Sequence, residues 1–110
     1  MVEACKCAVA TFHYTGDTKT LREMAIERKV FQGYLLADRV MRNLKIMREN
    51  CGIDIEDTSI EHAETIGEIF KGKEPYESLT LEESEHLERL LFRIEDDVVP
   101  KLVKCALEVD

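Results

Sequence analysis

The fold of this chain is decided by one stretch that opens with a helix-start signal and continues as an amphipathic helix, Thr80-Leu-Glu-Glu-Ser-Glu-His-Leu-Glu-Arg-Leu-Leu-Phe-Arg-Ile94. Thr80 and Glu83 have the spacing of a capping box, in which each side chain accepts a hydrogen bond from the other residue's main-chain N–H. Apolar residues then recur every three or four positions, which places them on one helical face: Leu87, Leu90, Leu91, Ile94, Val98, Leu102 and Cys105. The sequence predicts a helix over 81–107, kinked at Pro100 because proline removes a main-chain hydrogen bond.

Two further Thr-x-x-Glu boxes open apolar runs upstream. The box from Thr20 to Glu23 predicts a helix over 21–50 that exits at Cys51-Gly52. The box from Thr58 to Glu61 predicts a short helix over 59–71, followed by a loop over 72–78. The first of these helices has the apolar stripe Ile26, Val30, Gly33, Ala37, Val40, Met41, Leu44 and Met47, and the second buries Ala63, Ile66 and Phe70.

These assignments predict an all-α protein, a single helical domain over residues 1–110, with two long helices and one short helix in an up-down bundle. Segment 2–14 alternates like a strand but has the alanine content of a helix, so we expect a short helix or an extended arm there, followed by a turn at Thr15-Gly-Asp17. Gly33 has two interpretations: a second helix crosses closely at this position, or the glycine divides the first helix in two.

Composition limits the classes of partner. The 110 residues carry a net charge of −8, and the region 53–97 alone holds 15 acidic and 4 basic side chains. Such a surface repels phosphate, so nucleic-acid binding is unexpected, although an acidic helical protein could mimic DNA and inhibit a nucleic-acid-binding partner. No apolar stretch is long enough to span a membrane and no secretory signal opens the chain, so we expect a cytoplasmic protein.

The two long predicted helices carry more apolar surface than one core needs. The first has a second face that mixes apolar and arginine side chains, a composition typical of protein interfaces. The third has a second face formed by Leu81, Phe92, Val99 and Val103. Either the N-terminal arm covers this surface within one chain, or a second copy covers it in a homodimer. The predicted interface residues are Met24, Arg28, Phe31, Leu35, Arg39, Arg42 and Ile46.

The arginines of this face have abundant carboxylates available as partners. If they meet Glu82–Glu88 and Glu95–Asp97 across an interface, added salt should weaken association. On this interpretation, reversing the charge of Arg39 should slow association more than it affects folding.

One motif in the acidic region has the spacing of a metal ligand pair. Glu83 and His86 are three residues apart and share a helical face, and the segment 82–91 resembles the second metal helix of small ferritin-like proteins. That resemblance implies Glu83 and His86 as ligands of a carboxylate-bound metal. The nearest additional carboxylates, Glu64 and Glu68, lie on the face opposite Ile66, and Glu83 also serves as a capping-box residue.

A second pattern is similar to the MazG-like nucleotide pyrophosphohydrolases. It consists of Glu61-His-Ala-Glu64 followed by Glu85-His-Leu-Glu88, and the resemblance implies an all-α enzyme whose acidic pairs on successive helices hold Mg²⁺. Glu88 stands where the family's second motif has Asp, and Glu61 is also a predicted capping residue.

The four cysteines, Cys5, Cys7, Cys51 and Cys105, allow three states: a four-thiolate zinc site, a disulfide, or free thiols. An N-terminal arm antiparallel to the first helix would bring all four to one end of the bundle. In a chain without a secretory signal, free thiols are the expected state.

No residue stands out as catalytic. His13, His62 and His86 lack companions for a catalytic triad, and no glycine-rich phosphate loop or cofactor motif is present. We therefore expect a small acidic cytosolic protein that works by protein–protein interaction, as a homodimer or with a protein partner, rather than an enzyme. The alternatives are a metal-dependent protein of the MazG-like or ferritin-like kind, and an acidic DNA-mimic inhibitor.

Overall fold

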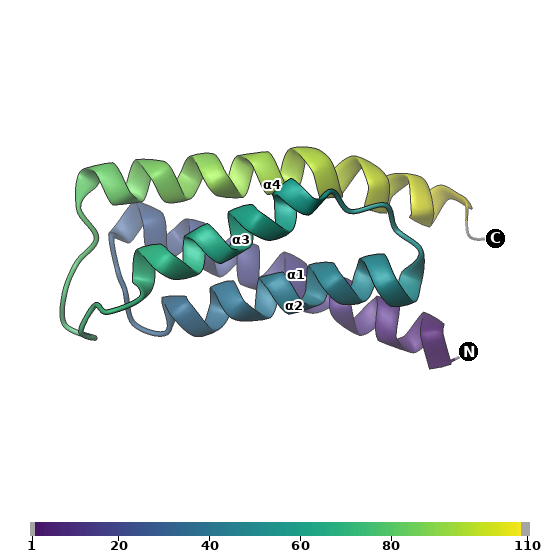
Figure 1. Ribbon diagram of the computed structural model, residues 1–110, viewed down its shortest axis with the longest axis horizontal. Coiled ribbons are helices and arrows are strands. Elements are labelled where there is room, and N and C mark those ends of the chain that lie inside the picture. The colour runs from purple at the N-terminus through teal and green to yellow at the C-terminus, as the bar shows by residue number, and fades with distance from the viewer. Residues whose placement is uncertain (1, 109–110) are drawn as a thin grey trace.

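Four helices make up the described chain in the computed structural model, which describes the backbone of residues 2–108 and the side chains of residues 7–105 and 107. They are α1 (Val2–Glu27), α2 (Gly33–Cys51), α3 (Asp57–Phe70) and α4 (Leu81–Glu108). Each helix packs on the next, and α4 packs back on α1 (Figure 1). The all-α prediction is confirmed, but the expectation of three main helices is wrong.

The fourth helix, which the sequence did not predict, arises because the helix predicted over 21–50 is divided in two. Arg28 and Gln32 both adopt left-handed backbone conformations, with φ of 59° and 64°, and the chain reverses direction between them. The reversal is held from both sides: Lys29 N–H donates to the Met24 carbonyl at 3.0 Å, and Gly33 N–H donates to the Val30 carbonyl at 3.0 Å. Of the two interpretations of Gly33, the break is therefore correct, and α2 begins at this residue.

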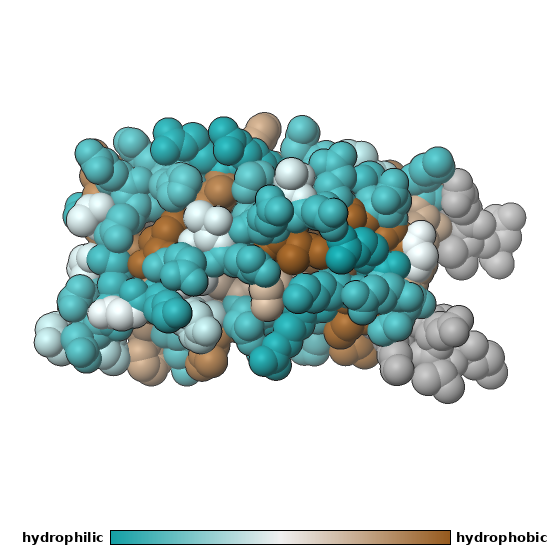
Figure 2. Space-filling model, viewed as in Figure 1, coloured by the Kyte–Doolittle hydropathy of each residue, from teal (hydrophilic) through white to brown (hydrophobic). Residues whose placement is uncertain are grey.

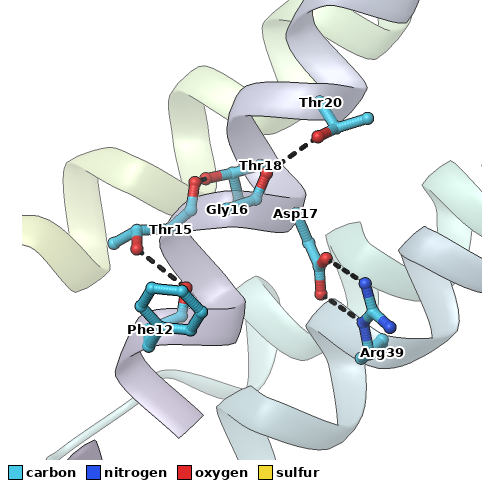
Figure 3. A network of polar contacts seen from close by, with 7 residues as sticks. All are labelled: Phe12, Thr15, Gly16, Asp17, Thr18, Thr20 and Arg39. Atoms are coloured by element: carbon cyan, nitrogen blue, oxygen red, sulfur yellow. Dashed lines mark hydrogen bonds and ion pairs between the residues drawn. The ribbon is translucent and has the colours of Figure 1, made fainter. Parts of the chain in front are cut away.

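The N-terminal segment belongs to a long helix rather than to an arm. α1 runs without interruption through Thr15-Gly-Asp17, so the predicted turn and the predicted capping box at Thr20 are both wrong. The Thr20 hydroxyl instead donates to the Gly16 carbonyl one turn earlier, at 3.0 Å (Figure 3). The helix persists because its apolar face is buried in the core, with the side chains Ala10, Tyr14, Leu21, Met24 and Ala25.

Helix α3 starts at Asp57, before the predicted box at Thr58. The Thr58 hydroxyl donates to the Glu56 carboxylate rather than capping the helix, so this second box is also wrong. The start of α3 is instead tied to α4, where the Asp97 carboxylate accepts from Glu56 N–H at 3.1 Å and from the Ser59 hydroxyl at 2.6 Å. Ala63, Ile66 and Phe70 are buried as predicted.

Helix α4 follows the sequence prediction most closely. Its capping box is present: Thr80 N–H donates to the Glu83 carboxylate at 2.9 Å, and Glu83 N–H donates to the Thr80 hydroxyl at 3.1 Å. Two residues of the predicted stripe, Leu102 and Cys105, are half-buried. The other five lie in the core: Leu87, Leu90, Leu91, Ile94 and Val98. Pro100 lies inside this helix, which continues beyond it to Glu108.

Gly33 also provides the close contact that its other interpretation required. A Cβ on this residue would overlap the ring of Phe70, the last residue of α3. Gly16, in the middle of α1, has open space where its Cβ would lie and an ordinary helical φ. A side chain is therefore excluded at Gly33, where the Phe70 ring fills the space, but could be accommodated at Gly16.

We expect Gly16→Ala to raise the free energy of unfolding by about 0.5–1 kcal/mol, because alanine restricts the unfolded chain and favours the helix. Gly33→Ala should lower the same quantity by about 1–3 kcal/mol, because the added methyl group displaces the Phe70 ring. Urea titrations followed by circular dichroism measure both changes, and equal effects of the two substitutions would contradict the Gly33–Phe70 contact.

Candidate interaction face on helices α1 and α4

The structure divides the predicted interface residues into three groups. Met24 lies in the core with only 7% of its surface exposed, beside the neighbouring helix residue Leu21, which is also buried, so the placement of Met24 in an external interface is wrong. They are covered within the chain because α1 and α2 are separate antiparallel helices that pack on each other. The core thus absorbs part of the surface that the sequence assigned to a second copy.

The arginines of this group are engaged within the chain. Arg39 donates to both carboxylate oxygens of Asp17, at 2.8 and 2.6 Å, and joins α2 to α1 (Figure 3). The hydrogen bonds and charge of Asp17 raise the pKa of Arg39 above its usual value. Arg42 pairs with Asp38 of its own helix at 3.0 Å. Arg28 donates through Nε to the Leu79 carbonyl at 2.7 Å, which fixes the chain reversal to the loop before α4.

Because the Asp17 side chain is only 4% exposed, loss of its partner leaves a buried carboxylate without its counter-charge. We expect Arg39→Ala to lower the free energy of unfolding by about 2–3 kcal/mol. Arg42→Ala, which removes an exposed pair within one helix, should cost about 0.5 kcal/mol or less. Thermal and urea unfolding of the two variants compare these costs. An Arg39→Ala variant that unfolds like the unmodified protein would instead favour the expectation that Arg39 affects association more than folding.

Phe31, Leu35 and Ile46 form the third group. Phe31 and Leu35 are exposed at the chain reversal, where they border a cavity of about 350 Å³ together with Tyr34 and Phe70. Ile46 is half-buried against the core. Phe31 and Leu35 thus remain available for contact, but they lie at one end of the molecule.

The second apolar face predicted for the last helix is fully present. Leu81, Phe92, Val99 and Val103 are all exposed on α4, between 43% and 65%, and Leu107 extends this exposed set at 78%. The opposite side of α4 is filled by core residues, so no other part of the described chain covers these side chains. The prediction that these residues exceed what the core can bury is confirmed.

An ion pair shows which side of the bundle this face occupies. Arg22 of α1 donates to the Glu95 carboxylate of α4 at 2.8 Å. Phe92 and Val99 lie three residues before and four residues after Glu95, so they share the face of α4 that bears the ion pair. Ile26 lies four residues after Arg22 on α1; its predicted place on the core stripe is wrong, because 67% of its surface is exposed. We define the α1–α4 face as Ile26, Leu81, Phe92, Val99 and Val103 with the Arg22–Glu95 pair.

The other side of the molecule has a different character. Figure 2 shows the side on which α3 lies in front, where hydrophilic residues dominate and hydrophobic atoms are visible mainly in the seams between helices. Glu61, Glu64 and Glu68 of α3 are exposed, as predicted for the outer side of this helix.

One polar cluster was missed by the sequence reasoning. The Asp97 side chain, 8% exposed, accepts from Lys101 Nζ at 2.5 Å in addition to Ser59 and Glu56 N–H. Burial alone would raise the pKa of Asp97, but these three hydrogen bonds outweigh it and hold the pKa below its usual value. No local pattern identifies Asp97, because its partners on α3 are about 40 residues away in sequence.

The lowered pKa of Asp97 makes the fold sensitive to acid. The ionised carboxylate stabilises the fold above the unfolded pKa of about 4, and this contribution is lost as the pH falls through the lower, folded value. We expect Asp97→Asn to lower the free energy of unfolding by about 2–3 kcal/mol at neutral pH, and the difference from the unmodified protein to shrink in acid. Asp96→Asn, at the exposed neighbouring residue, is the matched control. A difference that does not change with pH would contradict this role.

The described residues contain no group of three His, Cys, Asp or Glu side chains arranged to hold a metal ion. Glu83 accepts the capping hydrogen bond from Thr80 N–H and pairs with Lys73 at 3.0 Å. The hydrogen bond from Thr80, with Lys73 as a smaller contribution, lowers the pKa of Glu83 despite burial. The structure therefore brings no third ligand to Glu83 and His86, and it leaves the acidic pairs of the MazG-like pattern, on α3 and α4, exposed to solvent.

The cysteines adopt the disulfide that the sequence left as an alternative. Cys7 of α1 is bonded to Cys51 at the end of α2, and Cys105 of α4 is a free thiol; the side chain of Cys5 lies outside the described residues. The expectation of free thiols is wrong for Cys7 and Cys51, and these two sulfurs are not available for a four-thiolate zinc site. Persistent disulfides are rare in cytosolic proteins, so this bond does not support the expected cytoplasmic location.

Comparison with known proteins adds no relative. No family model matches the sequence, and neither the curated proteins nor the solved structures include a match to this chain. Within the described residues, none of the helices is both long enough and apolar enough to cross a membrane.

Proposed function

We propose that the protein is a helical interaction module that forms a homodimer through the α1–α4 face. The observation that carries the proposal is the row of large apolar side chains exposed along α4 while the opposite side of the helix fills the core. A helix on the surface of a monomer normally has one apolar stripe. Contiguous exposed apolar surface beyond that stripe is typical of interaction sites.

The shape of the molecule favours a lateral contact over an end-to-end one. Its dimensions are 46 × 23 × 21 Å. The projected area of a long side is therefore about 1,000 Å², and that of an end is about 500 Å². A stable interface buries about 800 Å² on each partner. The exposed residues of α4 extend from Leu81 to Leu107 along a side, whereas Phe31 and Leu35 occupy one end.

The charges of the α1–α4 face suit a second copy. The Arg22–Glu95 pair is partly exposed, with 43% and 26% of the side chains accessible, and it can lie among apolar contacts because its charges already neutralise each other. Phe92 borders a shallow cavity that is also lined by two acidic and two basic residues: Glu85, Glu88, Arg89 and Arg93. A helix that carries both signs of charge can pair with an antiparallel copy of itself, because acidic and basic residues then face each other.

The test compares two double substitutions that introduce the same charge at similarly exposed residues. Phe92→Glu with Val99→Glu would bury repelling carboxylates in the proposed interface, and we expect the dissociation constant to rise by a factor of about 100 or more. Phe31→Glu with Leu35→Glu, at the end of the molecule, should leave it unchanged. Sedimentation equilibrium measures association, and circular dichroism checks that helix content is retained.

Two outcomes would contradict the proposal. An unmodified protein that sediments as a monomer throughout the micromolar range would exclude the homodimer. Dissociation by the Phe31 and Leu35 substitutions but not by those at Phe92 and Val99 would place the interface at the chain reversal instead of on α4.

A further inference from the structure

At the end of the bundle where α1 begins and α2 and α4 end (Figure 1), three described cysteines lie outside the α1–α4 face: Cys7, Cys51 and Cys105. A cavity of about 400 Å³ opens there between the end of α2 and the last turns of α4. Its lining residues include Cys51 and Cys105, together with Ile53 and Lys101. The same cavity is thus lined by one cysteine of the Cys7–Cys51 disulfide and by the free cysteine Cys105.

We propose that this cavity is a thiol–disulfide exchange site in which Cys105 is the entering thiol. The Cys105 thiolate attacks Sγ of Cys51, the Cys51–Cys105 bond forms as the Cys7–Cys51 bond breaks, and Cys7 leaves as a thiolate that takes a proton from solvent. The step moves one disulfide to a new pair of sulfurs and needs neither an oxidant nor a reductant. This proposal is independent of the dimer, because it involves different residues and a different readout.

The arrangement of the three half-buried cysteines determines which sulfur is attacked. Cys51 lines the cavity that Cys105 also lines, whereas Cys7 is not part of its wall. Attack at Cys51 therefore follows from access, and Cys7 becomes the leaving group.

The end of α4 is the part of that helix best able to move. Pro100 has no N–H to donate to the Asp96 carbonyl, so α4 lacks one main-chain hydrogen bond where this end begins. Beyond Val98 the described side chains of α4 are exposed or half-buried, and Leu102 is the one that packs against the core. The exchange requires this end of α4 to move toward Cys51, and Leu102 is the core contact that such a movement would alter.

Exchange would change which helices are joined. The Cys7–Cys51 bond fastens the start of α1 to the end of α2, and from Cys7 onward the first buried side chain of α1 is Ala10. A Cys51–Cys105 bond would instead fasten α2 to α4 and release the first turns of α1. Exchange at this site thus controls whether the N-terminal part of α1 is attached to α2. The group that reacts with the disulfide is a cysteine thiol, that of Cys105.

Peptide mapping tests the exchange directly, because trypsin separates all four cysteines at Lys6, Arg48 and Lys104. The Cys5→Ser variant is incubated at mildly alkaline pH without reductant, its free thiols are blocked with N-ethylmaleimide, and the digest is analysed by mass spectrometry. We expect the Cys51–Cys105 linked peptide beside the Cys7–Cys51 one, with Cys7 alkylated in the same proportion. The linked peptide should come from the monomer band of a non-reducing gel and should be lost in Cys5→Ser with Cys105→Ser.

A second variant, Cys5→Ser with Cys7→Ser, tests whether Cys105 reaches Cys51. Treated with oxidised glutathione, it should form a glutathione adduct at Cys51 that Cys105 displaces, giving an internal disulfide. Persistent glutathione on Cys51 and Cys105 would overturn the proposal. So would a first experiment that yields only the Cys7–Cys51 peptide, or Cys51–Cys105 links found only in covalent dimers.

Discussion

The reversal of the chain between Arg28 and Gln32 is the constraint on which the rest of the structure depends. Two residues other than glycine hold left-handed conformations there, which cost of order 1 kcal/mol each unless the surroundings impose them. These conformations are imposed by contacts with a residue 51 positions later in the sequence. Leu79 N–H donates to the Arg28 carbonyl at 2.9 Å, and Arg28 Nε donates to the Leu79 carbonyl. The loop before α4 thus fixes the turn between α1 and α2.

The antiparallel pair that results explains how the excess apolar surface is distributed. Leu21 and Met24 become core residues because α1 folds back on α2, and the buried Asp17 carboxylate meets Arg39 across the same contact. The disulfide between Cys7 and Cys51 fastens the other end of this pair, and a cross-link across 44 residues reduces the entropy of the unfolded chain by an amount worth about 4 kcal/mol. Within the described residues nothing equivalent covers the outer side of α4, which exposes more large apolar side chains than any other helix.

The two ends and the side of the bundle therefore have different chemistry. One end presents Phe31 and Leu35 beside the reversal, the opposite end collects the sulfurs of Cys7, Cys51 and Cys105, and the α1–α4 face presents a lateral apolar surface. α3 contributes least to these surfaces, since its outer side is acidic and hydrophilic (Figure 2). A lateral dimer would leave both ends accessible, while Val103 of the α1–α4 face lies on the same end of α4 as Cys105.

The sequence by itself determined the helical class, the complete course of α4 and the apolar stripes of α2 and α3, because these depend on spacing within one helix. It also identified Phe92 and Val99 as surplus apolar residues. Three Thr-x-x-Glu boxes looked equivalent, yet only the one at Thr80 caps a helix. Thr20 lies inside α1, where burial of Tyr14 and Leu21 stabilises a continuous helix.

Tertiary structure alone decided where the chain reverses, which carboxylate of α4 binds the start of α3 and which cysteines pair. Asp97, Asp17 and Cys51 find partners that are 22 to 44 residues away, and no local pattern encodes such a distance. Burial then fixes the energetic importance of each contact, because a carboxylate removed from water requires the hydrogen bonds or counter-charge that only a second helix supplies.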